Sequence, residues 1–128
     1  MALTEHVELH EVSDLAEFSE EKRIRKKLFQ SKGSVCEIVC YEPGQNTVTH
    51  QHPLQDEILH IVEGDGVITF EDRDHIAVKP GSVVFVPAGI LHGIDTNDTD
   101  RLVVMCTKGP GVTGKATKNF MASEQSPD

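Results

Sequence analysis

Short apolar runs, each followed by a turn, constrain the fold of this chain more than any other feature of its sequence. Within residues 34–106, Val, Ile and Phe concentrate in the runs 35–41, 57–62, 67–70, 75–78, 83–86 and 102–106. Gly, Pro and Asp residues separate these runs, and the apolar positions recur with a period of two. Closely spaced strands joined by turns are typical of an antiparallel sandwich or barrel. The middle of the chain is therefore predicted to be all-β.

The two ends of the chain differ from its middle. With 128 residues and a hydrophobic fraction of 38%, the chain can fill one modest core. We predict an N-terminal extension over 1–30, a barrel over 31–108 and a C-terminal tail over 109–128. In the extension, residues 14–27 fit one helix, or a short helical turn followed by a strand from about 22 to 30. The tail cannot build a core of its own and is expected to be draped over the barrel or frayed.

Charge and composition exclude several function classes. Lys and Arg total 12 against 21 Asp and Glu, a formal net charge of −9, whereas nucleic-acid binding depends on neutralising phosphates with cations. No apolar run approaches the roughly 20 residues that cross a bilayer, and the N-terminus does not resemble a signal peptide. The 3 Cys residues therefore indicate reduced thiols rather than disulfides. We expect a small, soluble, cytoplasmic protein that binds neither nucleic acid nor membranes.

Three histidines and one glutamate form the candidate site. His50 and His52 are two residues apart, so they project from the same face of an extended strand. Glu57 follows after a bend at Pro53, and His92 begins a later strand after a Pro-Ala-Gly turn. Three imidazoles and one carboxylate suit divalent Fe, Mn, Ni, Zn or Cu. These four residues are predicted to bind one metal ion, with the histidines neutral and the glutamate ionised near pH 7.

The spacing of these residues matches two longer motifs. The first contains Gly44, His50, His52, Glu57 and Gly64, and the second contains Gly81, Pro87, Gly89 and His92. Both motifs resemble those of the cupin superfamily, and together they cover about residues 44–96. One position departs from the family pattern, because Thr96 stands where the second motif usually ends in Asn. That residue has a structural role in the family and is not a metal ligand, so the departure concerns the local turn only.

The resemblance implies a fold, a cofactor and an assembly. The fold would be a double-stranded β-helix, or jelly-roll, barrel whose four ligands point inward and bind one divalent transition metal per chain. Fe is the first choice of metal, with Mn, Ni, Zn and Cu as alternatives. Glu57 would also be the catalytic residue, since its carboxylate can accept a proton. Small cupins usually form homodimers, often by exchanging an N-terminal strand, and residues 22–30 are the candidate segment here.

Basic residues and cysteines each allow two interpretations. Half of the 12 basic residues lie just before the first apolar run, where they fit a solvated edge strand whose lysines discourage aggregation. Alternatively, Arg23 or Arg25 points into a pocket and holds a carboxylate. Cys36 and Cys40 are expected to pack as small hydrophobes. A thiol that lines the pocket is the alternative, with Cys106 as a further candidate.

Strand alternation predicts which side chains line the pocket. If Glu57 points inward, then Ile58, His60 and Val62 face outward. The side chains expected to face inward with the ligands are Val48, Leu59, Ile61 and Ile94, and the further expected lining residues are Phe29, Phe70, Phe85 and Met105. The pocket is expected to be apolar, with few polar groups, and to take a small substrate.

Two classes of function fit these features. The first is a metal-dependent enzyme that acts on a small organic molecule, an Fe(II) dioxygenase foremost, with lyase, isomerase or decarboxylase chemistry at the same site as alternatives. The second is a non-catalytic module that binds a metal or a small molecule. Turnover separates the two classes, because a binding module is stabilised by its ligand and leaves that ligand unchanged.

Overall fold

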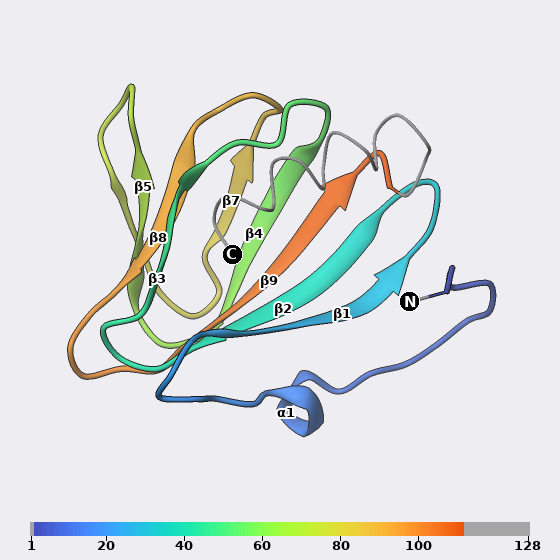
Figure 1. Cartoon of the computed structure of the whole chain (residues 1–128), viewed down its shortest axis with the longest axis horizontal. Helices are drawn as coiled ribbons and strands as arrows, with labels where there is room; N and C mark the ends of the chain where they lie inside the picture. The colour runs from blue at the N-terminus through green and yellow to red at the C-terminus, as the bar shows by residue number, and fades with distance from the viewer. Residues whose placement is uncertain (1, 112–128) are drawn as a thin grey trace.

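Antiparallel strands make up most of the part of the chain that the structure describes. The structure is a computed structural model and describes residues 2–111. Its elements are α1 (Val12–Leu15), β1 (Ile24–Gln30), β2 (Val35–Tyr41), β3 (Asn46–His50), β4 (Asp56–Glu63), β5 (Gly66–Phe70), β6 (Ile76–Val78), β7 (Val83–Val86), β8 (His92–Thr96) and β9 (Leu102–Gly109) (Figure 1). The all-β prediction is confirmed, and each predicted apolar run coincides with a strand. The tail predicted over 109–128 lies almost wholly outside the described residues.

Two sheets face each other and enclose the interior (Figure 1). The first has five strands in the order β1-β2-β9-β4-β7, and the second has four in the order β3-β8-β5-β6. All the paired strands run antiparallel. Since strands that are neighbours in one sheet are distant in sequence, such as β2 and β9, the chain winds between the sheets as a jelly roll does. The predicted jelly-roll fold is confirmed.

Apolar side chains fill one half of the space between the sheets. Leu59 and Ile61 of β4, Ile68 of β5 and Leu102 and Val104 of β9 are all at most 1% exposed. Burying a side chain of this size contributes about 1.5–3 kcal/mol relative to leaving it in water. On β4 the exposed Ile58, His60 and Val62 alternate with the buried positions, as predicted.

A second apolar cluster lies on the outer face of the five-stranded sheet. It contains Ile38 and Cys40 of β2, and the N-terminal residues Leu15 and Phe18 pack against it. The Arg101 guanidinium lies over the Phe18 ring, 4.3 Å from the ring centroid. The segment around α1 therefore covers this face of the sheet (Figure 1), and Cys40 packs as the small hydrophobe that was predicted.

The N-terminal extension has the second of its two predicted forms, a helical turn followed by a strand. The single helix over 14–27 is wrong, because α1 ends at Leu15 and β1 begins at Ile24. A helix of one turn makes too few hydrogen bonds to be stable alone, and this segment is held instead by its apolar contacts with the sheet. β1 pairs with β2 of the same chain and forms the edge of its sheet. Within residues 2–111, α1 is the only helix, and it is far too short to cross a membrane.

Two residues that were expected to line the pocket lie on the outside. Val48 is 50% exposed because β3 contains a bulge between Thr47 and His50, so that Thr47 faces inward in its place. Phe85 is 59% exposed because its partner across the ladder is Ile58, which faces outward. The prediction was therefore wrong for Val48 because a bulge interrupts the inward–outward alternation of β3, and wrong for Phe85 because the inward positions of β7 are the alternate residues.

The remaining expected lining residues pack elsewhere. Phe29 and Met105 pack against the outer cluster with the N-terminal segment, and Phe70 packs against the apolar core. On β9, Met105 lies out of phase with the buried Val104 and Cys106, which explains why it reaches the opposite face of the sheet.

Candidate metal centre

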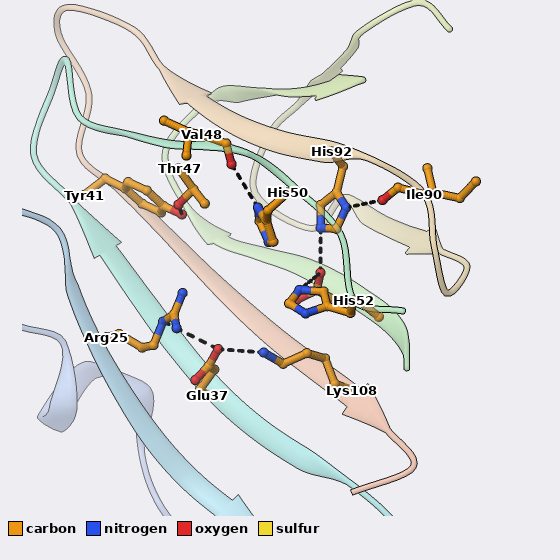
Figure 2. Close-up of polar contacts among 11 residues, drawn as sticks. Arg25, Glu37, Tyr41, Thr47, Val48, His50, His52, Ile90, His92 and Lys108 are labelled. Carbon is orange, nitrogen blue, oxygen red and sulfur yellow. Dashed lines mark hydrogen bonds and ion pairs between the residues drawn. The ribbon is translucent and has the colours of Figure 1, made fainter. Parts of the chain in front are cut away.

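The four predicted ligands come together at one end of the interior. His50 ends β3, His52 lies in the loop that follows, Glu57 is the second residue of β4 and His92 begins β8. One potential ligand atom from each residue lies within 4.8 Å of the other three. All four side chains are buried. Strands of both sheets and the loop after β3 thus bring one carboxylate and three imidazoles together, and Figure 2 labels the three histidines. These residues are called the His–Glu cluster below.

Backbone carbonyls orient two of the imidazole rings. Nδ1 of His50 lies 2.9 Å from the Val48 carbonyl oxygen, and Nδ1 of His92 lies 2.8 Å from the Ile90 carbonyl oxygen (Figure 2). A carbonyl can only accept, so each Nδ1 is the donor and carries the proton. In the neutral ring, Nε2 then keeps its lone pair, and this is the atom that a metal needs.

Glu57 lies between two histidines. Its Oε1 atom is 2.8 Å from Nε2 of His92 and 3.5 Å from Nε2 of His52. Burial alone would raise the pKa of Glu57, but the hydrogen bond with His92 and the charges of His52 and Lys108 lower it to about 2. Burial lowers the pKa of His92, and the hydrogen bond and negative charge of Glu57 outweigh this and raise it. Glu57 is therefore an anion at neutral pH.

The donor set of the His–Glu cluster fits a divalent transition metal. Imidazole nitrogen and carboxylate oxygen are borderline to hard ligands, which suit Fe, Mn, Ni, Zn and Cu. Three neutral donors and one anion also offset part of a double positive charge in a buried place. The cluster could therefore hold one such ion, and the donor set alone does not distinguish among these metals.

Hydrogen bonds connect the loops that carry the ligands. The Gly89 amide donates to the His52 carbonyl oxygen at 3.0 Å, and the Ala88 amide donates to Oδ1 of Asp56 at 3.0 Å. The turn before His92 is thereby tied to the segment that carries the other ligands. At the position where the motif departs from the family, the Thr96 hydroxyl donates to the Gln45 carbonyl oxygen at 2.6 Å. This bond fixes β8 to the turn that precedes β3.

A small cavity adjoins the His–Glu cluster. Its volume is about 20 Å³, which leaves room for one or two water molecules. Leu59 and Ile94 line it as predicted. The expectation of an apolar wall is wrong, however, because the cavity is also lined by Arg25, Glu37, Tyr41, Thr47, Cys106 and Lys108.

Three of these residues form a charged cluster, in which Glu37 and Lys108 are buried and Arg25 is partly exposed. Nζ of Lys108 donates to Oε1 of Glu37 at 3.2 Å, and Nε of Arg25 lies 3.7 Å from the same oxygen (Figure 2). Glu37 and Lys108 are each 1% exposed. Arg25 therefore points into the cavity, and the carboxylate beside it is that of Glu37. Arg23 does not line this cavity, and its Nη1 donates to the Asn46 carbonyl oxygen at 3.4 Å.

The sequence analysis missed Glu37 and Lys108, although alternation contained the signal. On β9, Lys108 continues the inward series of Leu102, Val104 and Cys106. On β2, Glu37 stands inside a run whose other members are mostly apolar. A charged residue in an inward position of a buried strand requires a partner, and each of these two is the partner of the other.

Three neutral polar groups also line the cavity, the hydroxyls of Tyr41 and Thr47 and the thiol of Cys106. The Tyr41 hydroxyl and the Thr47 hydroxyl are 2.8 Å apart and hydrogen bonded. Burial raises the pKa of the Cys106 thiol well above its ordinary value. Cys106 lines the cavity, which was the alternative predicted for a thiol in this chain, and its raised pKa keeps the thiol neutral.

The sequence of residues 37–108 matches the family model for the cupin domain. This chain belongs to the cupin family. A cupin-domain match over this range includes both motifs and all four residues of the His–Glu cluster.

This cupin is similar in sequence to parts of several other proteins. It is 29% identical over 75 residues to an uncharacterised protein of Methanocaldococcus jannaschii, covering 59% of each chain. It is 30% identical over 78 residues to an oxalate-binding protein of Thermotoga maritima, covering 60% of this chain and 64% of that one. The cupin thus spans less than two thirds of the length of these relatives.

A solved structure confirms the fold. The cupin superposes with a TM-score of 0.77 on an uncharacterised protein with a double-stranded β-helix domain from Klebsiella pneumoniae. The match covers 85% of this chain and 95% of that chain at 19% identity. At this identity the likeness concerns the fold and carries no statement about activity.

Proposed function

We propose that His50, His52, Glu57 and His92 bind one divalent transition metal, and that the protein is a metal-dependent enzyme acting on a small organic molecule. The convergence of three imidazoles and one carboxylate within 4.8 Å in a buried place is the observation that supports this proposal. Iron is the first metal to test, and Fe(II) dioxygenase chemistry is the first reaction. When bound, such a metal supplies a Lewis acid and coordination positions for small oxygen ligands.

The residues around the site have distinct roles in this proposal. His50 and His92 present Nε2 because backbone carbonyls hold their Nδ1 protons. Glu57 is ionised at neutral pH, which suits it to be the anionic ligand. We also propose it as the catalytic residue, whose carboxylate would accept a proton from a substrate. The cavity of about 20 Å³ holds one or two water molecules, so the side chains around it would have to move apart to bring an organic substrate to the His–Glu cluster.

Oxygen uptake by the iron-loaded protein tests the enzymatic proposal. The protein is loaded with Fe(II) under anaerobic conditions and then mixed with dioxygen and a set of small enolisable or catecholic substrates. We expect uptake with at least one substrate, and its loss in Glu57→Gln and His52→Ala. The control is His60→Ala, because His60 is exposed on the same strand as Glu57. No uptake with any substrate would refute the dioxygenase assignment, and product formed without uptake would indicate lyase, isomerase or decarboxylase chemistry.

A non-catalytic binding protein is the second candidate. The T. maritima relative, which is named as an oxalate-binding protein, favours this candidate. A binding protein would be stabilised against thermal unfolding by its ligand, and the ligand would be recovered unchanged after prolonged incubation. Recovery of a chemically altered compound would exclude this candidate.

We also propose that two copies form a homodimer. On the outer face of β4 and β7, Ile58, Val83 and Phe85 are 43%, 64% and 59% exposed. Apolar side chains that gather on one exposed sheet face often mark an interface. Sedimentation velocity is expected to give the mass of a dimer, and Phe85→Glu is expected to give monomers. A monomeric wild-type protein would contradict this proposal.

A further inference from the structure

Two hydroxyl groups on the cavity wall have no part in the proposed reaction so far. The hydroxyls of Tyr41 and Thr47 lie 2.8 Å apart, and both side chains line the cavity that adjoins the His–Glu cluster (Figure 2). These two groups are called the hydroxyl pair below. Tyr41 is 0% exposed and Thr47 is 5% exposed. Because the cavity has a volume of only about 20 Å³, a molecule inside it lies within reach of the hydroxyl pair and of the proposed metal ligands alike.

Strand geometry directs both hydroxyls inward. On β2, Tyr41 lies in phase with Val39, which lines the same cavity. On β3, the bulge turns Thr47 inward where unbroken alternation from His50 would have placed the apolar Val48. The bulge therefore exchanges an apolar side chain for a hydroxyl at the cavity wall.

The hydroxyl pair has one proton more than its internal hydrogen bond uses. Each hydroxyl carries one proton, and the bond between the two groups engages one of them, whichever group is the donor. Burial raises the pKa of Tyr41, so the phenol keeps its proton. The second proton of the pair requires an acceptor, as buried polar groups generally do. A molecule in the cavity can supply that acceptor.

We propose that the hydroxyl pair donates a hydrogen bond to a water-sized oxygen ligand held against the His–Glu cluster, and so favours ligands that accept hydrogen bonds. This inference rests on the proposed metal site and assigns residues that position its smallest ligand. The neutral thiol of Cys106 on the same wall is only a weak donor. Arg25 and Lys108 are the competing donors on this wall, because both carry several N–H groups. Variants of the hydroxyl pair distinguish between these sources.

Fluoride is the probe, because it resembles hydroxide in size and charge and accepts hydrogen bonds without donating any. Its dissociation constant is measured from the visible absorption of Co(II)-loaded protein, with chloride as a weaker acceptor of the same charge. We expect Tyr41→Phe/Thr47→Val to reduce the preference for fluoride over chloride by about tenfold or more, which corresponds to one hydrogen bond to a charged group. The single variant with the larger loss identifies the hydroxyl that touches the ligand.

Thr49→Val is the matched control, because Thr49 lies on the same strand as Thr47 but does not line the cavity. It should keep the wild-type preference. A second readout needs no variant, because Tyr41 is the only tyrosine of the chain and the chain has no Trp. The tyrosine absorption band therefore reports on this hydroxyl alone. In Zn(II)-loaded protein, whose metal does not absorb in this region, fluoride should shift the band.

An unchanged preference in the folded double variant would overturn the inference and assign the donor to Arg25 or Lys108. Equal weakening of fluoride and chloride would also overturn it, because a purely structural role affects both anions alike. If the double variant fails to fold, an unshifted tyrosine band in the wild type would overturn it instead. Metal content is measured separately. A protein that binds Co(II) but gives one of these results retains its proposed metal site, whereas a protein that binds neither Co(II) nor Zn(II) loses both proposals.

Discussion

The two halves of the barrel interior differ in chemistry although the same strands build both. β4 contributes Leu59 and Ile61 to the apolar half and Glu57 to the site. β9 contributes Val104 to the apolar half and Lys108 to the cavity wall. All these side chains point inward and all are buried. The pleat of each strand therefore determines which way a side chain points. The residue type at each inward position then determines whether that half of the interior is an apolar core or a candidate metal site.

The difference between the halves is also energetic. Each apolar side chain in the first half contributes favourable burial. Each charge in the second half loses its hydration, and its partner restores this loss only in part. The apolar half therefore carries the stability that lets the other half hold buried ionised groups. Substitutions in the two halves should have separable effects on stability and on binding.

The largest loss of stability is expected when a charge in the site half loses its partner. Lys108→Met removes the buried ammonium group that donates to Glu37 and leaves Arg25 as an ion-pair partner of that carboxylate, and breaking a buried ion pair costs about 3–5 kcal/mol. The double variant Glu37→Gln/Lys108→Met, which removes both charges, should recover most of that loss. Urea unfolding gives the free energy of unfolding for each variant. A double variant as unstable as Lys108→Met would contradict this account of the cluster.

A substitution in the apolar half should reduce stability and leave metal binding intact. Ile61→Ala opens a cavity among fully buried side chains and is expected to cost about 2–5 kcal/mol. Bound metal per folded chain should stay at the wild-type level, because Ile61 lies outside the His–Glu cluster. Urea unfolding gives the free energy of unfolding, and elemental analysis of the same sample gives the metal content per folded chain. Loss of metal from folded Ile61→Ala would show that the halves are not separable.

A smaller effect is expected at the turns, where two glycines offer a matched pair. Gly64 and Gly44 both have positive φ, at 81° and 89°. A Cβ on Gly64 would overlap the carbonyl of Arg101, next to Leu102 of the apolar half, whereas a Cβ on Gly44 meets nothing within 4 Å. Gly44→Ala should cost about 1–2 kcal/mol from backbone conformation alone, and Gly64→Ala should cost more. Equal costs in thermal unfolding would show that the overlap is relieved without strain.

The smallest expected effect is a pH dependence that changes sign with metal. In the metal-free protein the pKa of Glu57 is lowered from 4.5, so its contribution to stability is present above pH 4.5 and is lost as the pH falls toward about 2. The pKa of His92 is raised above 6.5, so its contribution is present below pH 6.5 and is lost as the pH rises through the raised value.

From pH 6.5 upward, the metal-free protein should therefore become less stable, and His92→Gln should flatten this slope. With metal bound the slope should reverse, since the ligands must lose their protons to bind and stabilisation by the metal grows with pH. Unfolding at a series of pH values, with and without a chelator, measures both slopes. Parallel slopes in the two states would indicate that the metal binds elsewhere.

Much of this arrangement could be predicted from the sequence. Alternation on β4 gave the inward Glu57, Leu59 and Ile61, because that strand is regular from its second residue through Ile61. The motif spacing predicted which residues would meet although His52 and His92 are 40 residues apart, because glycine-bounded turns place both beside the same strand ends.

The rest depends on features that single strands do not reveal. The bulge in β3 that turns Val48 outward is visible only in its pairing with β8. Phe85 faces outward because of its register with Ile58 on another strand. The partnership of Glu37 and Lys108, 71 residues apart, follows from the placement of β2 beside β9. Long-range strand pairing therefore accounts for each of these misses.

Metal content per folded chain tests the central claim most directly. Purified wild-type protein and His92→Ala are analysed for transition metals, as isolated and after reconstitution with Fe, Mn, Ni, Zn and Cu in turn. We predict about one equivalent in the wild type and a loss of affinity in His92→Ala that exceeds the roughly 10- to 100-fold cost of losing an outer partner of a ligand. His60→Ala should bind like the wild type. A folded wild-type protein that takes up none of these metals, or a His92→Ala variant that binds as tightly, would contradict the claim.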